Sequence, residues 1–227
     1  MINSLVSAFL VGATFLSSNP ALAEQIDGPA YQIGDSWDFQ EVDDWSNNVS
    51  QEDHFEVTGS LGDFVRLRET TRVRNPGNNQ MENRTPDVLS ARADMNTDYV
   101  GKDGSIQHRV NYSWPLTVGK SWTYDYEAPN QVNNQTYYFQ YRMSAQVVGW
   151  ETVTTPAGVF RALKIVHQGK STNQAASASP GYRVAWTYWY APEVKRAVKS
   201  VIQTDTVSGA PNIRMSILMT AYKPAPH

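Results

Sequence analysis

The sequence predicts an all-β, antiparallel protein whose two related halves form a sandwich or a half-open barrel, with little helix. The main observation is an alternation of apolar and polar side chains over several long segments, which is the pattern of half-buried strands. The second observation is that short motifs from the first half of the chain recur in the second half. Beyond residue 23, no segment keeps the 3.6-residue period of an amphipathic helix over three turns.

Residues 1–23 have the layout of a secretory signal peptide. An uncharged, mostly apolar run from Leu5 to Leu16 is followed by Ala21-Leu22-Ala23, a typical small-residue cleavage site. The run is shorter than the roughly 20 apolar residues that cross a bilayer. We therefore expect cleavage after Ala23 and a periplasmic or secreted protein without a transmembrane segment in the mature chain. An N-terminal helix docked on the domain is the alternative.

A Gly-x-Ser-Trp motif occurs at residues 34–37 and again at residues 119–122. The second copy ends like a phosphate-binding loop, but Trp114 stands five residues before its Gly-Lys pair, where that loop requires glycine. The first copy has Asp35 where the second has Lys120, so this position is not a shared phosphate ligand. We interpret the motif as a repeated structural element.

Further matches extend this repeat. Residues 55–68 match the ends of residues 145–165, and the second copy has the longer hairpin. Residues 97–110 and 187–201 each consist of an aromatic strand, a turn and a returning strand. The matched positions are Val57 with Val147, Gly59 with Gly149, and residues 64–67 with residues 160–163.

We expect the mature chain, residues 24–227, to form a single β domain with an internal duplication. Its halves span about residues 31–110 and 111–222, and no linker-like composition separates them. Two independent domains are the alternative. Residues 86–95, with the sequence PDVLSARADM, are the best helix candidate, and it is a short one.

The clearest strands are predicted in the second half of the chain. Because successive side chains of a strand point to opposite faces, each apolar set is expected to share one face. These sets are Tyr137, Phe139, Tyr141, Met143, Ala145 and Val147; then Tyr182, Val184, Trp186, Tyr188 and Tyr190; and finally Ile213, Met215, Ile217, Met219 and Ala221. Opposite the second set lie Arg183, Thr187 and Trp189.

Three of these motifs together resemble a widespread family of exported bacterial proteins with no established activity. Their pattern is a Gly-x-x-Trp-x-Tyr strand, a Pro-Ala-Gly-x-Phe hairpin and an aromatic Trp-Tyr-x-Pro strand that ends in Val-Lys. The resemblance covers roughly residues 114–203, with a degenerate echo in the first half. It implies the fold class and an exported location, and it supplies no catalytic residue.

The composition excludes several function classes. The chain has no cysteine, so we expect neither disulfides, nor a thiolate metal site, nor a lipid-bearing cysteine. The net charge is −3 and no basic run occurs, which argues against nucleic acid and anionic membranes as partners. No two of the four histidines lie within four residues of each other, so local metal-ligand spacing is absent. We expect no cofactor.

The acidic residues between positions 35 and 44 are the main candidates for catalysis. Two carboxylates that face each other across a cleft would suit glycoside hydrolysis. Alternation along a strand and a turn at residues 43–48 instead predict carboxylates that point into solvent. The cluster consists of Asp35, Asp38, Glu41, Asp43 and Asp44.

The aromatic residues of the second half suggest a ligand site. Seven Trp and twelve Tyr are many for this length, and Trp186, Tyr188 and Tyr190 form a row on one strand face. Such a row forms either part of the core or a concave surface for an apolar or ring-shaped ligand. Trp189 lies on the opposite face, while Lys195 and Arg196 are placed to attract an anionic group at the rim.

The sequence therefore predicts a non-enzymatic exported protein of the cell envelope. Its partner would be an apolar or aromatic small ligand or another envelope protein. Two alternatives stay open: a hydrolase of envelope polysaccharide that uses the acidic residues, and a structural or assembly subunit whose aromatic residues are buried in an interface.

Overall fold

The structure is a computed structural model, and it describes residues 24–132, 135–173 and 181–226. The predicted signal peptide, residues 1–23, lies outside these ranges. The elements are β1 (Ser36–Asp43), β2 (Asn48–Leu61), β3 (Phe64–Arg74), β4 (Met81–Asn83), β5 (Asp87–Arg92), β6 (Thr97–Val100), β7 (Ile106–Arg109), β8 (Ser121–Val132), β9 (Gln135–Thr155), β10 (Gly158–Asn173), β11 (Tyr182–Ala191), the 3-10 turn η1 (Pro192–Val194), β12 (Arg196–Thr206) and β13 (Pro211–Lys223).

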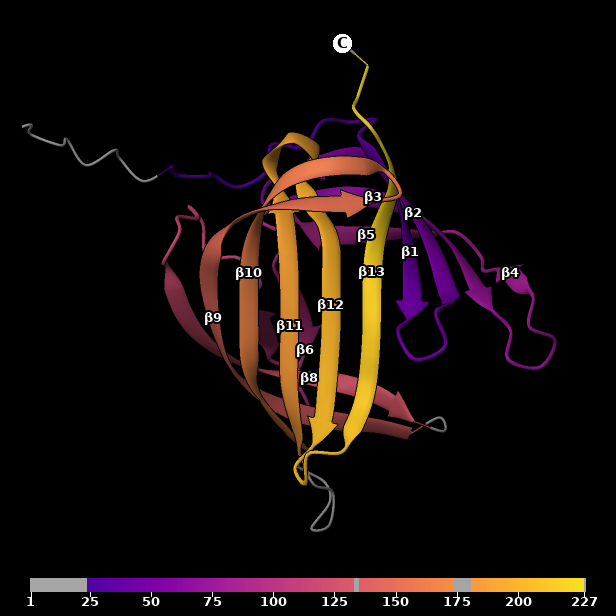
Figure 1. Cartoon of the computed structure of the whole chain (residues 1–227), viewed down its shortest axis with the longest axis vertical. Helices are drawn as coiled ribbons and strands as arrows, with labels where there is room; N and C mark the ends of the chain where they lie inside the picture. The colour runs from indigo at the N-terminus through magenta and orange to yellow at the C-terminus, as the bar shows by residue number, and fades with distance from the viewer. Residues whose placement is uncertain (1–23, 133–134, 174–180, 227) are drawn as a thin grey trace, which may run out of the picture.

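The predicted all-β, antiparallel fold class is confirmed. Eleven strands form one sheet in the order β4-β3-β2-β1-β13-β12-β11-β10-β9-β8, with β5 paired to β3, and β6 and β7 form a second, two-stranded sheet. All the strand pairs are antiparallel. The large sheet is strongly curved, its end strands do not pair with each other, and it therefore stays open (Figure 1).

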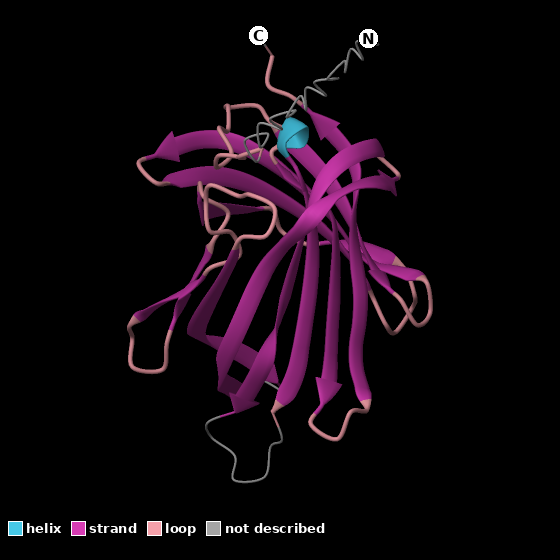
Figure 2. Cartoon of the chain, turned by 60° about the vertical axis from the view of Figure 1, so that its left-hand side comes forward, coloured by secondary structure: helices cyan, strands magenta, loops and turns pink. Residues whose placement is uncertain are grey.

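Helix is almost absent from the described part of the chain. The single helical element there is the 3-10 turn η1, near one end of the sheet (Figure 2). In the same residues, no helix has the length and hydropathy needed to span a membrane. The helix candidate at residues 86–95 is wrong, because residues 87–92 form strand β5 and pair with β3. Tertiary pairing overrides the weak local preference of this short segment.

The β9–β10 hairpin bends over one end of the sheet (Figure 1). The N–H group of Ala157, at its tip, donates a 3.1 Å hydrogen bond to the carbonyl of Met219 in β13. A β-bulge between Lys164 and Ile165 interrupts the pairing of the hairpin, and bulges bend strands. The core cluster that the hairpin covers includes Trp37, Val57, Leu67, Val153, Phe160, Val198 and Met219.

The segment between β5 and β8 packs against the inner face of β8–β11. Its aromatic residues belong to two further core clusters. The predicted inward faces of residues 137–147 and 182–190 contribute to the strand side of these clusters, together with residues of β8 and β10. The residues that pack from the segment are Met95, Tyr99, Val110, Tyr112, Trp114 and Leu116.

The two Gly-x-Ser-Trp motifs have the same local geometry. Each starts with a glycine at positive φ, 99° at Gly34 and 88° at Gly119, where a side chain would be strained. The amide of each glycine donates a 2.8 Å hydrogen bond to a valine carbonyl, Val57 in the first copy and Val147 in the second. Each valine amide returns a 2.9 Å hydrogen bond to the residue after the glycine.

The strand register shifts one detail of the predicted repeat. Val57 lies opposite Leu67, and Val147 lies opposite Ile165. Leu67 in the first copy therefore has the same strand position as Ile165 in the second copy. The sequence match suggests Leu163, which is two residues earlier. The internal duplication itself stays a prediction.

Candidate functional site

A groove with a volume of about 280 Å³ lies beside β1, β2, β11, β12 and β13. Part of its lining is a row of cross-strand neighbours. Tyr188 of β11 lies opposite Ser200 of β12, and Ser200 lies opposite Ile217 of β13. Alternation along β11 directs Tyr188 to this face, and antiparallel pairing places the two smaller side chains next to it.

Four aromatic rings from separate parts of the chain line the groove. Phe39 of β1 and Phe55 of β2 have ring centroids 6.2 Å apart, and Tyr112 and Tyr188 have centroids 6.0 Å apart. Together with a few polar groups, such rings form the usual composition of a small-molecule site. The arrangement can therefore remove a flat or elongated apolar ligand from water.

Arg196, the first residue of β12, is the cationic group of the groove. Its guanidinium carbon lies 4.8 Å from the ring centroid of Trp37, 5.0 Å from that of Phe55 and 5.9 Å from that of Phe39. Within the described residues, no carboxylate oxygen lies within the 4.0 Å that defines an ion pair with it. The rings stabilise the cation, and its N–H donors still have no anionic acceptor.

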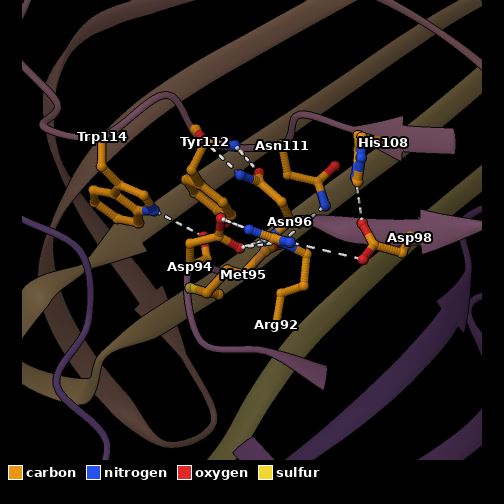
Figure 3. A network of polar contacts seen from close by, with 9 residues as sticks. All are labelled: Arg92, Asp94, Met95, Asn96, Asp98, His108, Asn111, Tyr112 and Trp114. Carbon is orange, nitrogen blue, oxygen red and sulfur yellow. Dashed lines mark hydrogen bonds and ion pairs between the residues drawn. The ribbon is translucent and has the colours of Figure 1, made fainter. Parts of the chain in front are cut away.

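A polar network holds the residues that the connecting segment contributes to the groove (Figure 3). Asn96 bonds both backbone groups of Tyr112: its Oδ1 accepts from the amide at 2.9 Å, and its Nδ2 donates to the carbonyl at 3.1 Å. The Nδ2 of Asn111 donates to the carbonyl of Met95 at 3.1 Å. The indole of Trp114 donates to the carbonyl of Asp94 at 2.7 Å. These bonds fix Met95, Asn111 and Tyr112, all of which line the groove.

An ion-pair network anchors the same segment to β5. The guanidinium of Arg92 lies 2.8 Å from one carboxylate oxygen of Asp94 and 3.7 Å from Asp98. Asp98 also lies 2.7 Å from Nδ1 of His108 (Figure 3). The wall of the groove is thus held at the base of the β6–β7 hairpin, where the chain enters and leaves it.

Acidic and neutral polar groups complete the site. Asp53 lines the groove, and its carboxylate accepts hydrogen bonds from Thr71 at 2.8 Å and from Gln51 at 2.9 Å. Burial raises the pKa of the nearby Glu69 carboxyl, Asp53 raises it further, and Arg196 opposes the rise. Asn111 is 9% exposed, and its Oδ1 has no hydrogen-bond partner within the described chain.

Behind the groove, Arg109 occupies an aromatic cage. Its guanidinium donates a 2.5 Å hydrogen bond to the Tyr188 hydroxyl and lies 3.9 Å from the ring centroid of Trp186. Within the described residues, no carboxylate pairs with Arg109, and its buried Nε has no partner. Burial, and then the charge of Arg109, lowers the pKa of His167 to about 3, so this imidazole is neutral near pH 7.

The structure distributes the predicted site residues over four environments. Tyr188 and Arg196 line the groove. Trp186 and Tyr190 are core residues, 7% and 1% exposed. Trp189 lies on the other face, where its indole donates to Glu151 at 2.7 Å. Lys195 forms an ion pair with buried Asp35 at 2.6 Å.

The five acidic residues of the predicted catalytic cluster separate in space. Asp35 is buried against Lys195, and Asp38 bonds Nδ1 of His54 at 2.6 Å. The other three accept local hydrogen bonds: Glu41 from Ser50, Asp43 from the amide of Trp45, and Asp44 from Ser216. None of the five lines the groove.

Two of the other depressions on the described chain are lined mainly by polar residues. The larger, of about 600 Å³, lies over β8, β9 and β10 and has no aromatic side chain in its lining. The second, of about 360 Å³, contains the Asp38–His54 pair together with Glu52, whose carboxylate is paired with Arg72 at 2.6 Å. Across the ranges that the structure describes, no group of three His, Asp or Glu residues is placed to hold a metal ion.

No protein-family model matches the chain, and no curated protein is significantly similar to it in sequence. Membership in the family that the motifs resemble therefore stays a prediction. The solved structures that this chain partly resembles include a protein from Parabacteroides distasonis described as a lipoprotein. It has 14% identity and a TM-score of 0.46, and the match covers 88% of this chain and 99% of that chain.

Two further structures are similar to a comparable degree. A protein from Bacteroides fragilis, described as exported and as having a YmcC-like fold, has 12% identity and a TM-score of 0.46, covering 88% of this chain and 99% of that one. The hypothetical lipoprotein YmcC from Escherichia coli has 12% identity and a TM-score of 0.43, covering 86% and 87%. Similarity at this level supports no conclusion about activity.

Proposed function

We propose that the protein is a non-enzymatic, exported binding protein of the cell envelope that binds a small apolar or aromatic ligand in this groove. The observation that carries the proposal is the convergence of four aromatic rings on one open site: Phe39, Phe55, Tyr112 and Tyr188. Burial of apolar ligand surface against them contributes about 25 cal/mol per Å². The fixed wall of the groove limits the entropy lost on binding.

The separated acidic residues favour binding over polysaccharide hydrolysis. A glycosidase needs two free carboxyl groups on opposite sides of one scissile bond. Asp35 is occupied by Lys195, Asp38 by His54, and Glu52 by Arg72. None of these side chains lines the aromatic groove, and the carboxylate that does, Asp53, already accepts hydrogen bonds from Thr71 and Gln51.

Filling the groove tests the proposal. Ala197 lines the groove, and Ala197→Phe would occupy its volume. Ala185 is a matched control, because it lies on β11 with its side chain on the face opposite to Tyr188. Native mass spectrometry should detect a co-purified ligand on the parent and on Ala185→Phe but not on Ala197→Phe.

Neutral probes extend the test to protein purified without its ligand. Isothermal titration calorimetry with naphthol and decanol should show one site on the parent and a loss of at least tenfold in affinity for Ala197→Phe. Equal binding by both variants, or no binding of either probe to the parent, would contradict the proposal. Thermal melting of each variant controls for folding.

A further inference from the structure

We infer that the ligand of the groove is an amphiphilic anion, an apolar body with one carboxylate or phosphate group that binds Arg196. This inference rests on the proposed function, because it concerns the chemistry of the same groove. The apolar body would lie against the aromatic rings, and the acidic group would accept hydrogen bonds from the guanidinium.

The first support is the position of Arg196 among the arginines that contact rings. Four arginines of the described chain lie over aromatic rings: Arg92, Arg109, Arg161 and Arg196. Arg92 and Arg161 also have a carboxylate partner. Arg109 has none, but it is enclosed by its aromatic cage and bonds Tyr188. Arg196 alone of these four lines the groove without a carboxylate partner.

The second support is the contrast with the neighbouring lysines. Lys195 is neutralised by Asp35, 2.6 Å away. Lys199 points to the opposite face of the sheet, where it lies 5.1 Å from the ring centroid of Trp189. Of the three successive cations that follow η1, Arg196 is therefore the one that a ligand in the groove can reach.

The acidic side chains near Arg196 do not form the ion pair that an anionic ligand would form with its guanidinium. The Asp53 carboxylate is held by Thr71 and Gln51, and neither Asp53 nor Glu69 is within ion-pair distance of Arg196. Burial favours the neutral form of Glu69. The cation is thus held in place by rings and lacks a counter-charge in contact.

Matched probes test the charge of the ligand. Naphthoate is compared with naphthol, and decanoate with decanol, so that each pair differs in its head group and the two pairs distinguish a ring body from an acyl body. Calorimetry of the parent should give affinities about tenfold to a hundredfold higher for the acids, since a hydrogen bond to a charged group contributes about 1.5–3 kcal/mol. This preference should shrink as the salt concentration rises.

Two variants of Arg196 then assign the preference to one side chain. Arg196→Gln should lose most of the preference for the acids, measured as the ratio of acid affinity to neutral affinity within the same variant, and Arg196→Lys should keep part of this ratio. Lys199→Gln removes one positive charge from the other face of the same strand and should change nothing.

The outcomes separate this inference from the proposed function. If the neutral probes bind the groove but the acids bind no more tightly, or if Arg196→Gln keeps the preference, the anion inference is wrong and the binding function stands. If no probe binds the parent, or if Ala197→Phe binds every probe normally, both fail. If Arg196→Gln does not fold, Arg196→Lys decides the matter, because an acid preference equal to that of the parent would then contradict the role of the guanidinium.

Discussion

The Nζ atom of Lys195 lies 2.6 Å from a carboxylate oxygen of Asp35, and the Asp35 side chain is completely buried. The same carboxylate accepts the amide hydrogen bonds of Gln32 at 2.8 Å and Ala225 at 3.0 Å. One side chain therefore connects the start of β1, the turn before β12 and the C-terminal segment.

Lys195→Met should destabilise the protein by about 3–5 kcal/mol, because it leaves a buried carboxylate without its counter-ion. The measurement is equilibrium unfolding in urea. Arg68→Met is the matched control, since Arg68 pairs with Glu56 on the surface at 3.0 Å and an exposed pair contributes less than about 1 kcal/mol. Equal losses for the two variants would show that the buried pair has no special role.

The Asp35 carboxyl also predicts a pH dependence of stability. Although burial raises its pKa, the hydrogen bonds from Lys195, Gln32 and Ala225 outweigh this effect and hold the pKa below its usual 3.8. Folding therefore favours the ionised form, so the associated stability is present above pH 3.8 and is lost as the pH falls through the folded-state pKa. The difference in unfolding free energy between the parent and Asp35→Asn should be constant near neutral pH and narrow below pH 3.8. A difference that widens there would contradict this sign.

Much of the fold could be predicted from alternation alone. The inward faces are confirmed from Phe139 to Val147 and from Tyr182 to Tyr190, because a half-buried strand places its apolar residues on one side. Residues 86–95 could not be assigned correctly, since β5 is a six-residue edge strand with little pattern of its own and exists through its pairing with β3. The pairing of β1 with β13 could not be predicted either, because it joins residues from opposite ends of the chain and no local sequence pattern indicates it.

Part of the candidate site could be predicted from the sequence. Tyr188 and Arg196 could be proposed as ligand-binding residues from their positions along β11 and β12, and both line the groove in the structure. Phe39, Phe55 and Tyr112 could not be connected with them, because strand order and the path of the segment after β7 bring these rings together. The carboxylate partner of Lys195 is 160 residues away in sequence and likewise gave no signal.

Trp186 and Trp189 should respond differently to truncation, although they are three residues apart on one strand. Trp186 is 7% exposed and lies under the Arg109 guanidinium, so Trp186→Ala should cost about 3–5 kcal/mol in unfolding free energy. Trp189 is only partly buried on the other face, where it packs against the edge of a core cluster, and Trp189→Ala should cost less, about 1–2 kcal/mol. Urea unfolding of the two variants measures the difference, and the reverse order would mean that the sheet packs with its other face inward.

Glu69→Gln should stabilise the protein at neutral pH. Burial raises the pKa of the Glu69 carboxyl above 4.5, with further contributions from Asp53 and Asp87, and Arg196 opposes them. The folded state thus holds this proton more tightly than the unfolded state, so stability falls as the pH rises from 4.5 through the folded-state pKa. Glutamine removes that loss of stability. The variant should melt at the same temperature as the parent below pH 4.5 and at a higher temperature at pH 7.

Glu56→Gln is the control for this prediction, because it breaks the exposed pair with Arg68 and should not raise the melting temperature. Glu69→Gln melting below the parent at pH 7 would mean that the ionised carboxylate stabilises the groove through Arg196, and the anion site would then be partly satisfied from within the chain.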